Sequence, residues 1–191
     1  TLQPSMTTTW GRWLDLYPDT RLLVSDGTTQ FAELFSPDPI TGFAAPDPFG
    51  GDADGVNAGR FAFPVFEEKL DGRLLAGEVV ITVELNSAAK AYPLSLLVHE
   101  PINDVVDGQP VVIFPSTLGA VAYIATAPGN EITFQSEGGA FVNVETGSTW
   151  DAVGRAVAGP LEGSQLEGAP SRRAFWFSVA LALPGNEIYS R

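Results

Sequence analysis

The sequence predicts a mostly β fold of the α+β class: an antiparallel β-rich sandwich or barrel-like domain with short helices near both termini. Short runs rich in β-branched and aromatic residues, which favour strands, recur through the second half of the chain. Turn pairs such as Asp107-Gly108 separate these runs. The clearest helical spacing lies close to the two ends of the chain.

A short amphipathic helix is predicted at the N-terminal end. Its apolar residues recur at helical intervals and form one stripe: Trp10, Trp13, Leu14 and Tyr17. Thr8 and Thr9 are candidate N-caps, and Pro18 ends the helix. Residues 21–25 then predict a short strand that the Asp26-Gly27 turn closes.

Residues 36–64 form a loop-rich insert that is dense in Pro, Gly and Asp. This composition predicts no regular element. Because long loops in a compact domain are usually functional, we expect a binding loop or a covering flap.

Five strands are predicted after this insert, since each run is short, apolar and bounded by turn residues: residues 79–85, 111–114, 121–124, 132–135 and 141–144. Their spacing indicates an antiparallel arrangement. One or two helical turns over residues 93–100 interrupt the series, because Leu94, Leu97 and Val98 share a helical face after Pro93.

The C-terminal end repeats the pattern of the N-terminal end. Ser171 is a candidate cap for a second helix, and a proline turn then precedes a strand over residues 187–190. The apolar residues of this helix are Phe175, Trp176, Val179 and Leu183. Three positions of the two segments correspond: Trp10 with Trp176, Pro18 with Pro184 and Leu22 with Ile188. This indicates either an internal duplication or two amphipathic helices that each end at a proline.

Composition excludes several kinds of chemistry. The chain has 191 residues, 10 Lys and Arg against 23 Asp and Glu, a formal net charge of −13, no cysteine and one histidine. The absence of cysteine excludes disulfides, thiolate nucleophiles and iron–sulfur clusters, and one histidine excludes a multi-histidine metal site within one chain. The acidic balance disfavours nucleic acid as a partner, because phosphate binding needs clustered basic residues.

We expect a single domain over residues 1–191, since a chain of this length buries a sizeable core without disulfides. The longest apolar stretch, residues 174–183, is about half of the roughly 20 residues in a membrane helix, so no membrane span is expected. The chain opens without Met, as a mature terminus does after a signal segment is removed, and a trimmed sequence opens in the same way. We therefore expect an extracytoplasmic location: periplasmic, cell-surface or secreted.

Several short motifs occur in a characteristic order: Ala91-Tyr92-Pro93-Leu94, His99-Glu100-Pro101-Ile102-Asn103-Asp104, Gly108-Gln109-Pro110-Val111, Thr146-Gly147-Ser148-Thr149-Trp150, Gly159-Pro160-Leu161 and Phe175-Trp176. Together they resemble the prokaryotic domain-of-unknown-function family numbered 3179, over about residues 71–191. The Trp-x-x-Trp and Tyr-Pro-Asp-Thr segment near the start resembles another part of that family. The resemblance implies an exported or lipid-anchored protein and carries no established activity.

The sequence departs from the resembling family at one place. Typical members carry Cys-Pro-Leu-Cys-Gly where this chain has residues 115–119, so Pro115 and Leu118 stand at the two cysteine positions. Neither proline nor leucine supplies a nucleophile or a metal ligand. Any thiol function of the family is therefore absent from this chain.

The lone histidine is the centre of one candidate site. His99 with Glu100, Asn103 and Asp104 can serve as a base or as a metal or haem ligand oriented by a carboxylate, or as a structural cap beside a turn. A Ser-His-Asp triad has to use His99 with Asp104 and either Ser95 or Ser116. The chain lacks the Gly-x-Ser-x-Gly motif, which disfavours a hydrolase of that kind.

A second candidate site lies in the insert. Asp52, Asp54 and Asn57 place oxygen ligands at a spacing that calcium loops use, although the pattern departs from an EF-hand. The alternative is a solvated acidic turn. The four tryptophans are expected to pack in the core rather than to stack on a ligand.

The sequence therefore predicts an exported, non-catalytic binding or assembly module, a candidate subunit of an extracytoplasmic complex with a protein partner or a second copy of itself. Calcium is the candidate cofactor. The alternative is a metal- or haem-dependent enzyme or electron-transfer accessory centred on His99, with Glu100 and Asp104 beside it.

Overall fold

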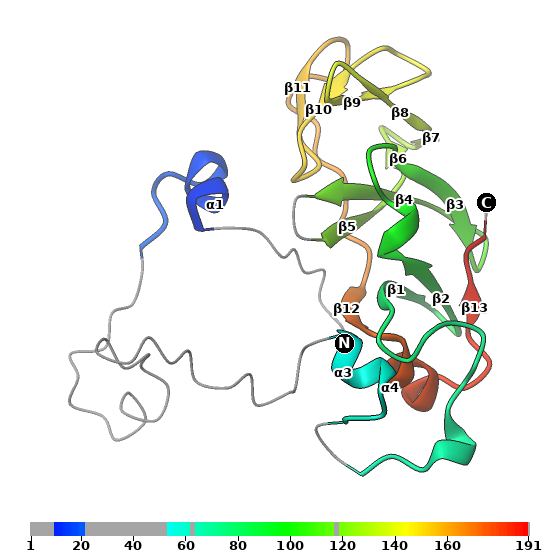
Figure 1. The fold of residues 1–191 in the computed structure, drawn as a ribbon. Coiled ribbons are helices and arrows are strands. Elements are labelled where there is room, and N and C mark those ends of the chain that lie inside the picture. The colour runs from blue at the N-terminus through cyan, green and yellow to red at the C-terminus, as the bar shows by residue number, and fades with distance from the viewer. Residues whose placement is uncertain (1–9, 22–52, 62–63, 117–118, 191) are drawn as a thin grey trace, which may run out of the picture.

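The computed structural model describes residues 10–21, 53–61, 64–116 and 119–190. These residues form a mostly β protein, built from several small sheets, with two short helices (residues 53–57 and 176–182) at one end of the stack and a third (residues 10–16) outside it (Figure 1). The strands within each sheet are antiparallel, with one parallel pair at an edge. The predicted fold class is confirmed, and the described residues contain no closed barrel.

The first sheet brings together strands from the beginning and the end of the segment 79–188. Its strand order is β12 (Ser171–Phe175), β1 (Val79–Leu85), β2 (Ala88–Pro93) and β13 (Glu187–Ile188). Asn86, at a positive φ of 51°, turns the chain between β1 and β2, a conformation that asparagine tolerates better than most residues. The short β13 pairs in parallel with β2 and closes one edge.

The second sheet is the meander β3 (Ile102–Val106), β4 (Gln109–Ser116) and β5 (Gly119–Ile124). Asp107 and Gly108 connect β3 to β4 with φ values of 48° and 75°, as a tight hairpin with two left-handed positions requires. The inner faces of the first two sheets share one apolar core that includes Ile81, Tyr92 and Ile113.

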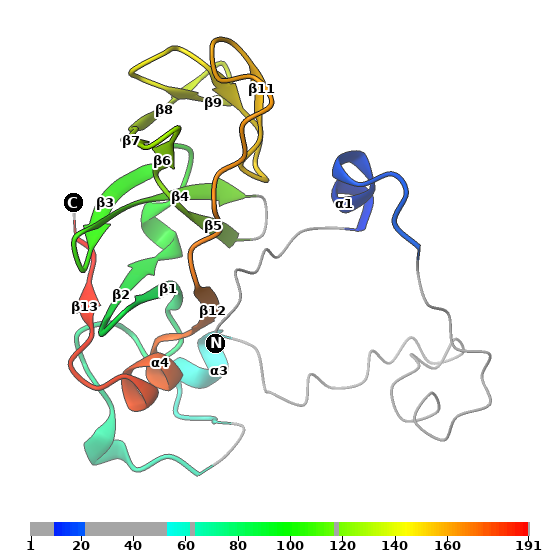
Figure 2. The same cartoon turned by 180° about the vertical axis from the view of Figure 1, so that it is seen from behind.

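The third sheet lies at the far end of the stack in both views (Figures 1 and 2). Its order is β11 (Ala156–Ala158), β10 (Thr149–Trp150), β9 (Ala140–Asn143) and β8 (Phe134–Glu137), and the small pair β6 (Thr126–Ala127) and β7 (Asn130–Glu131) precedes it. An aromatic core joins it to β4, where the rings of Phe114 and Phe141 stack at 4.1 Å.

Three short α-helices occur in the described residues: α1 (Trp10–Leu16), α3 (Ala53–Asn57) and α4 (Trp176–Ala182). Two 3₁₀ turns, η1 (Glu67–Lys69) and η2 (Leu94–Leu96), complete the elements. Helix α4 packs against the first sheet in a core with Val80, Ala91 and Val179. No helix among the described residues has the length and apolar character needed to cross a bilayer.

Several predicted elements are confirmed. Helix α1 ends before Pro18, and β1 has the predicted bounds. The runs at 111–114, 121–124 and 141–144 fall on β4, β5 and β9, whereas the run at 132–135 is shifted two residues into β8. The strand predicted over residues 21–25 lies almost wholly outside the described residues.

Other predictions were wrong, mostly because tertiary contacts overrode local signals. Ser171 does not cap a helix: residues 171–175 form β12, paired with β1, and α4 begins only at Trp176. Residues 93–100 contain a single 3₁₀ turn, with Leu97 buried and Val98 exposed. The insert contains α3, because Val56 is buried against the body of the protein. Strands β2 and β3 were not predicted.

Candidate functional site

An open hollow of about 940 Å³ lies between α1 and the third sheet. Arg12 and Leu16 of α1 form part of its wall. The rest comes from residues 98–100, the end of β4, Ser136 of β8, the turn glycines 138 and 139, the start of β9, and the stretch from Thr149 to Ala152 with Val157. Apolar and polar side chains contribute about equally, so the hollow offers both van der Waals and hydrogen-bonding partners.

Trp150 forms a rigid part of this wall. It is fully buried, its Nε1 donates to Oδ1 of Asn143 at 3.2 Å, and its ring meets Phe134 edge to face at 5.7 Å. Its indole face is therefore committed to the core, as predicted for the tryptophans, a prediction that holds for Trp150 and Trp176 and is wrong for Trp10, which is 48% exposed. It supports the hollow rather than offering a stacking surface.

The Thr146–Trp150 motif builds the loop that carries Trp150. The Oδ1 atom of Asn143 also accepts from Thr146 Oγ1 at 2.9 Å, and Ser148 Oγ accepts from the Leu161 N–H at 3.0 Å. Gly159 is needed here, because a Cβ at this position would lie 2.7 Å from the Ser148 Cα, and its φ is 93°. The motif is structural.

Glu145 joins the same loop to Thr133, the residue before β8. Its carboxylate accepts from the Thr133 N–H at 2.9 Å and from Thr133 Oγ1 at 2.8 Å. Burial acts to raise the pKa of Glu145, but the hydrogen bonds from Thr133 and Asn143 outweigh it, and the pKa lies below the usual 4.5. The carboxylate thus stays ionised and holds the loop.

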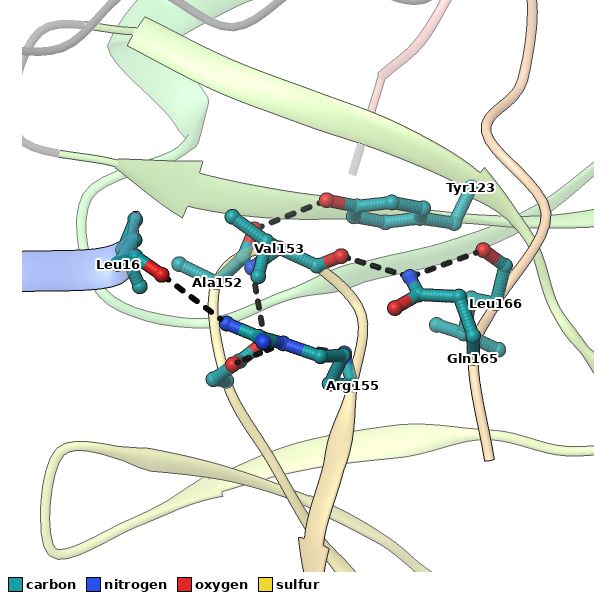
Figure 3. A network of polar contacts seen from close by, with 8 residues as sticks. Leu16, Tyr123, Ala152, Val153, Arg155, Gln165 and Leu166 are labelled. Carbon is teal, nitrogen blue, oxygen red and sulfur yellow. Dashed lines mark hydrogen bonds and ion pairs between the residues drawn. The ribbon is translucent and has the colours of Figure 1, made fainter. Parts of the chain in front are cut away.

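Asp151 organises the turn that follows Trp150. Its Oδ1 accepts from the N–H groups of Val153 at 3.0 Å and Arg155 at 2.9 Å. Tyr123 also holds the turn, donating to the Ala152 carbonyl at 3.0 Å, and Gln165 donates to the Val153 carbonyl at 2.8 Å (Figure 3). Burial first, and then the nearby Asp151 charge, raise the pKa of Tyr123, so the phenol stays protonated as a donor.

Arg155 joins this turn to α1. Its Nε lies 3.3 Å from Oδ2 of Asp151, and its Nη2 reaches the Leu16 carbonyl at 3.5 Å (Figure 3). Its guanidinium also lies over the Tyr17 ring, 5.6 Å from the centroid. One side chain therefore links the wall of the hollow to the end of α1.

The structure places His99 and Glu100 on the wall of the hollow, and both are exposed. The His99 carbonyl accepts from Ser136 Oγ at 2.7 Å, and Glu100 Oε2 accepts from the Ser136 N–H at 3.1 Å. These bonds fix the segment to β8. They leave the imidazole without a carboxylate partner among the described residues.

Asn103 and Asp104 are not brought to the hollow with His99. They lie in β3, where the Asn103 side chain exchanges two hydrogen bonds of 2.8 Å with the Phe134 backbone and so links the second sheet to the third. Asp104 turns to the first sheet, with Lys90 Nζ at 2.7 Å and the Tyr92 hydroxyl at 3.0 Å. Burial first, and then the Asp104 charge, raise the pKa of Tyr92.

The two serines of the triad hypothesis lie in different parts of the structure. Ser95 donates to Glu78 Oε1 at 2.7 Å, away from the hollow, whereas Ser116 lines it. Pro115, at one of the two cysteine positions of the resembling family, lines the hollow as well. Leu118, at the other, lies outside the described residues.

Of the three residues predicted to bind calcium, the structure describes Asp54 and Asn57. Asp52 lies outside the described residues, Asp54 is exposed on α3, and the Asn57 Oδ1 accepts from the Gly77 N–H at 2.7 Å. A Cβ on Gly77 would meet the Ala53 carbonyl, so this glycine lets α3 pack closely. Within the described ranges, no three His, Asp or Glu residues gather as a metal site. The calcium loop stays a prediction, which a thermal melt with and without chelator tests.

One cluster was missed from the sequence. The Arg73 side chain donates to both carboxylate oxygens of Asp71 and, through Nη1, to the Asn186 carbonyl at 2.9 Å. Its guanidinium lies 5.2 Å from the centroid of the Trp176 ring, whose Nε1 donates to the Asp71 carbonyl at 2.8 Å. The signal in the sequence was the Asp-Gly-Arg triplet at the start of the family-like region. The cluster fixes α4 and is far in sequence from the hollow.

Comparison with known proteins gives one match. A family model described as a protein of unknown function (DUF3179) matches residues 1–185. No curated protein and no solved structure matches the chain significantly.

Proposed function

The chain belongs to the DUF3179 family, and we propose that it is a non-catalytic binding module that holds a protein partner in the hollow, as a subunit of an extracytoplasmic complex. The hollow itself carries the proposal. At about 940 Å³ it lies at the upper end of the range for ligand pockets, so it has room for a segment of polypeptide.

The rim of the hollow supports a protein partner. Val98 is 63% exposed and Val157 is 51% exposed, and both line the hollow although they come from different parts of the chain. Single exposed valines are ordinary, but apolar side chains that gather with Leu16 around a concavity are typical of a binding site. Burying them on association removes apolar surface from water, which favours binding.

The polar groups favour binding over catalysis. Glu100 and Asp151 both accept backbone hydrogen bonds, and the imidazole of His99 has no orienting carboxylate in the part of the chain that the structure describes. General-base catalysis needs an oriented base within reach of a substrate proton. Asp104, the predicted partner of His99, is instead held by Lys90 and Tyr92.

Site-specific photo-crosslinking tests this proposal in the native host. A photoreactive phenylalanine at Val157 is expected to capture one defined partner, and the adduct is expected to disappear when Val98 is changed to Asp. Val105, which is also 51% exposed but lies in β3, is the matched control position. Equal capture at both positions, or capture unaffected by Val98→Asp, contradicts the proposal. Fractionation of the host cells checks the extracytoplasmic location.

The alternative function retains one supporting observation, because His99 and Glu100 do line the hollow together. A metal- or haem-dependent enzyme or electron-transfer accessory at this site predicts stoichiometric metal or haem in the purified protein. Loss of that metal in His99→Ala, with the fold intact, would favour the alternative over the binding module. Elemental analysis and an absorption spectrum give the answer.

A further inference from the structure

One lysine and one aspartate meet between the first two sheets. Lys90 lies two residues before Tyr92 in β2, and Asp104 lies two residues after Ile102 in β3. Tyr92 and Ile102 belong to the core that the two sheets share. Because alternate residues of a strand share a face, Lys90 and Asp104 face this core as well. Their side chains are only 16% and 17% exposed, and Lys90 Nζ lies 2.7 Å from Asp104 Oδ2.

We propose that Lys90 and Asp104 join in an intramolecular isopeptide bond, an amide between Nζ and Cγ that ties β2 of the first sheet to β3 of the second. An amine held at hydrogen-bond distance from a carboxyl oxygen stands beside the carbon that bears it, and such fixed proximity accelerates a reaction strongly. The reaction releases one water molecule and needs no oxidant, cofactor or second substrate.

The groups around the Asp104 carboxylate fit this reaction. The Val105 N–H donates to Oδ1 at 2.8 Å, and the Tyr92 hydroxyl donates to Oδ2 at 3.0 Å. Donors in such positions stabilise the negative charge that develops on oxygen when a nucleophile attacks the carbon. Burial raises the pKa of Tyr92, so its hydroxyl stays protonated and remains a donor.

Glu187 supplies a base beside the amine. It lies opposite Lys90 in the parallel pairing of β13 with β2, and its Oε2 is 3.8 Å from Lys90 Nζ. The Tyr189 ring lies 5.8 Å from the same Nζ, measured to the ring centroid, and stacks on Tyr92 at 5.4 Å. The two aromatic rings limit the access of water to the pair, which favours the amide over its hydrolysis.

The protons balance with these groups alone. One ammonium proton of Lys90 passes to Asp104 Oδ2 along the 2.7 Å contact. The nitrogen lone pair attacks Cγ, negative charge builds on Oδ1, and the nitrogen gives a second proton to Glu187. Glu187 passes this proton to Oδ2, the bond from Cγ to Oδ2 breaks, and Oδ2 leaves as water. Oδ1 becomes the amide carbonyl oxygen, and the nitrogen keeps one hydrogen.

The bond closes residues 90–104 into a covalent ring. This ring includes Val98, His99 and Glu100, which line the hollow, so the bond restrains that part of the wall. The chain has no cysteine, and therefore a disulfide cannot serve this purpose. The bond forms without a partner in the hollow, so its test is independent of the crosslinking experiment.

Mass spectrometry of the intact full-length chain tests the proposal. Lys69 and Lys90 are the two lysines of the sequence. After denaturation in urea and acetylation of free amines, we expect a mass deficit of one water molecule, with the label on Lys69 and none on Lys90. A chymotryptic fragment in which Lys90 and Asp104 are linked is expected as well.

Two matched variants and one kinetic variant complete the experiment. Lys90→Arg keeps the positive charge and is expected to restore the full mass, whereas Lys69→Arg is the control and keeps the deficit. Circular dichroism checks that both are folded. Glu187→Gln is expected to slow the loss of water by at least about tenfold in chain sampled at intervals after cell-free synthesis.

A folded wild-type chain of full sequence mass, in which both lysines react after denaturation, overturns the proposal without any variant. A deficit that persists in Lys90→Arg overturns it too, because dehydration of the Asp107-Gly108 turn to a succinimide gives the same mass. An unchanged rate in Glu187→Gln overturns the proton transfer through Glu187.

Discussion

Helices α1 and α4 have similar sequences, but α4 is packed in the core and α1 is not. Each has seven residues, begins with tryptophan and is followed within two residues by proline. Trp176 of α4 is fully buried, whereas Trp10 of α1 is 48% exposed. Figure 1 shows α4 against the first sheet and α1 outside the stack of sheets.

The difference comes from what the rest of the chain brings to each helix. Asp71 and Arg73 enclose the Trp176 ring, and the Trp176 N–H donates to the Glu78 carbonyl at 2.7 Å. The end of α1 instead meets the exposed side chain of Arg155. An apolar stripe thus predicts a helix, but the surface it meets decides whether that helix belongs to the core or to a site.

The largest expected difference is in the free energy of unfolding of two variants, one at Trp176 and one at Trp10. Trp176→Ala leaves a cavity in a packed core and is expected to lower the free energy of unfolding by about 3–5 kcal/mol. Trp10→Ala removes an exposed ring and is expected to change it by less than about 0.5 kcal/mol. Urea unfolding followed by circular dichroism measures both. Similar losses in the two variants would show that α1 is part of the core.

The two arginines that serve these helices give a smaller contrast. Arg73→Ala removes several hydrogen bonds in the cluster around α4, and we expect a loss of about 1–2 kcal/mol, reduced by partial exposure. Arg155→Ala is expected to cost less than about 1 kcal/mol, because its contacts to α1 are exposed. The same unfolding experiment compares them. A larger loss for Arg155 than for Arg73 contradicts the assignment of roles.

The smallest expected effect is the contribution of Asp71 to the loss of stability at acidic pH. Hydrogen bonds from the Arg73 side chain hold the pKa of Asp71 below its ordinary 3.8 and outweigh the effect of burial. A lowered folded-state pKa contributes stability that is present above the unfolded pKa and lost as pH falls through the folded one. The urea midpoint of the wild type is therefore expected to fall more steeply below about pH 4 than that of Asp71→Asn. Parallel curves for the two proteins would show that this carboxylate contributes no pH dependence.

Local sequence patterns predicted several strands, but they failed where the structure depends on contacts with segments far away in the sequence. The run of β-branched residues in β1 and the Asp107-Gly108 turn each specify their structure locally. The local sequence favours Ser171 as a helix cap, but its segment pairs with β1 and forms a strand. Asn103 is typical of a turn, but its side chain binds the Phe134 backbone. Pairing between segments far apart in sequence leaves no local signal.

The candidate site was predictable in part for the same reason. His99 and Glu100 were found because the lone histidine is conspicuous in the composition, and both line the hollow. Asp104 was joined to them by nearness in sequence, but it lies in β3, where successive residues face opposite sides: Asn103 is bound to the Phe134 backbone and Asp104 to Lys90. The roles of Arg155 and Val157 at the hollow depend on the packing of the third sheet, which the sequence does not reveal.

Hydrogen exchange of the two helices tests the central claim most directly. The account predicts that amides at the end of α1, such as that of Tyr17, exchange by local unfolding of the helix, far faster than those of α4, which open only with the core. It also predicts that Arg155→Ala speeds exchange in α1 and leaves α4 unchanged. Equal protection of the two helices, insensitive to Arg155→Ala, would show that α1 is held as firmly as α4 and contradict the account.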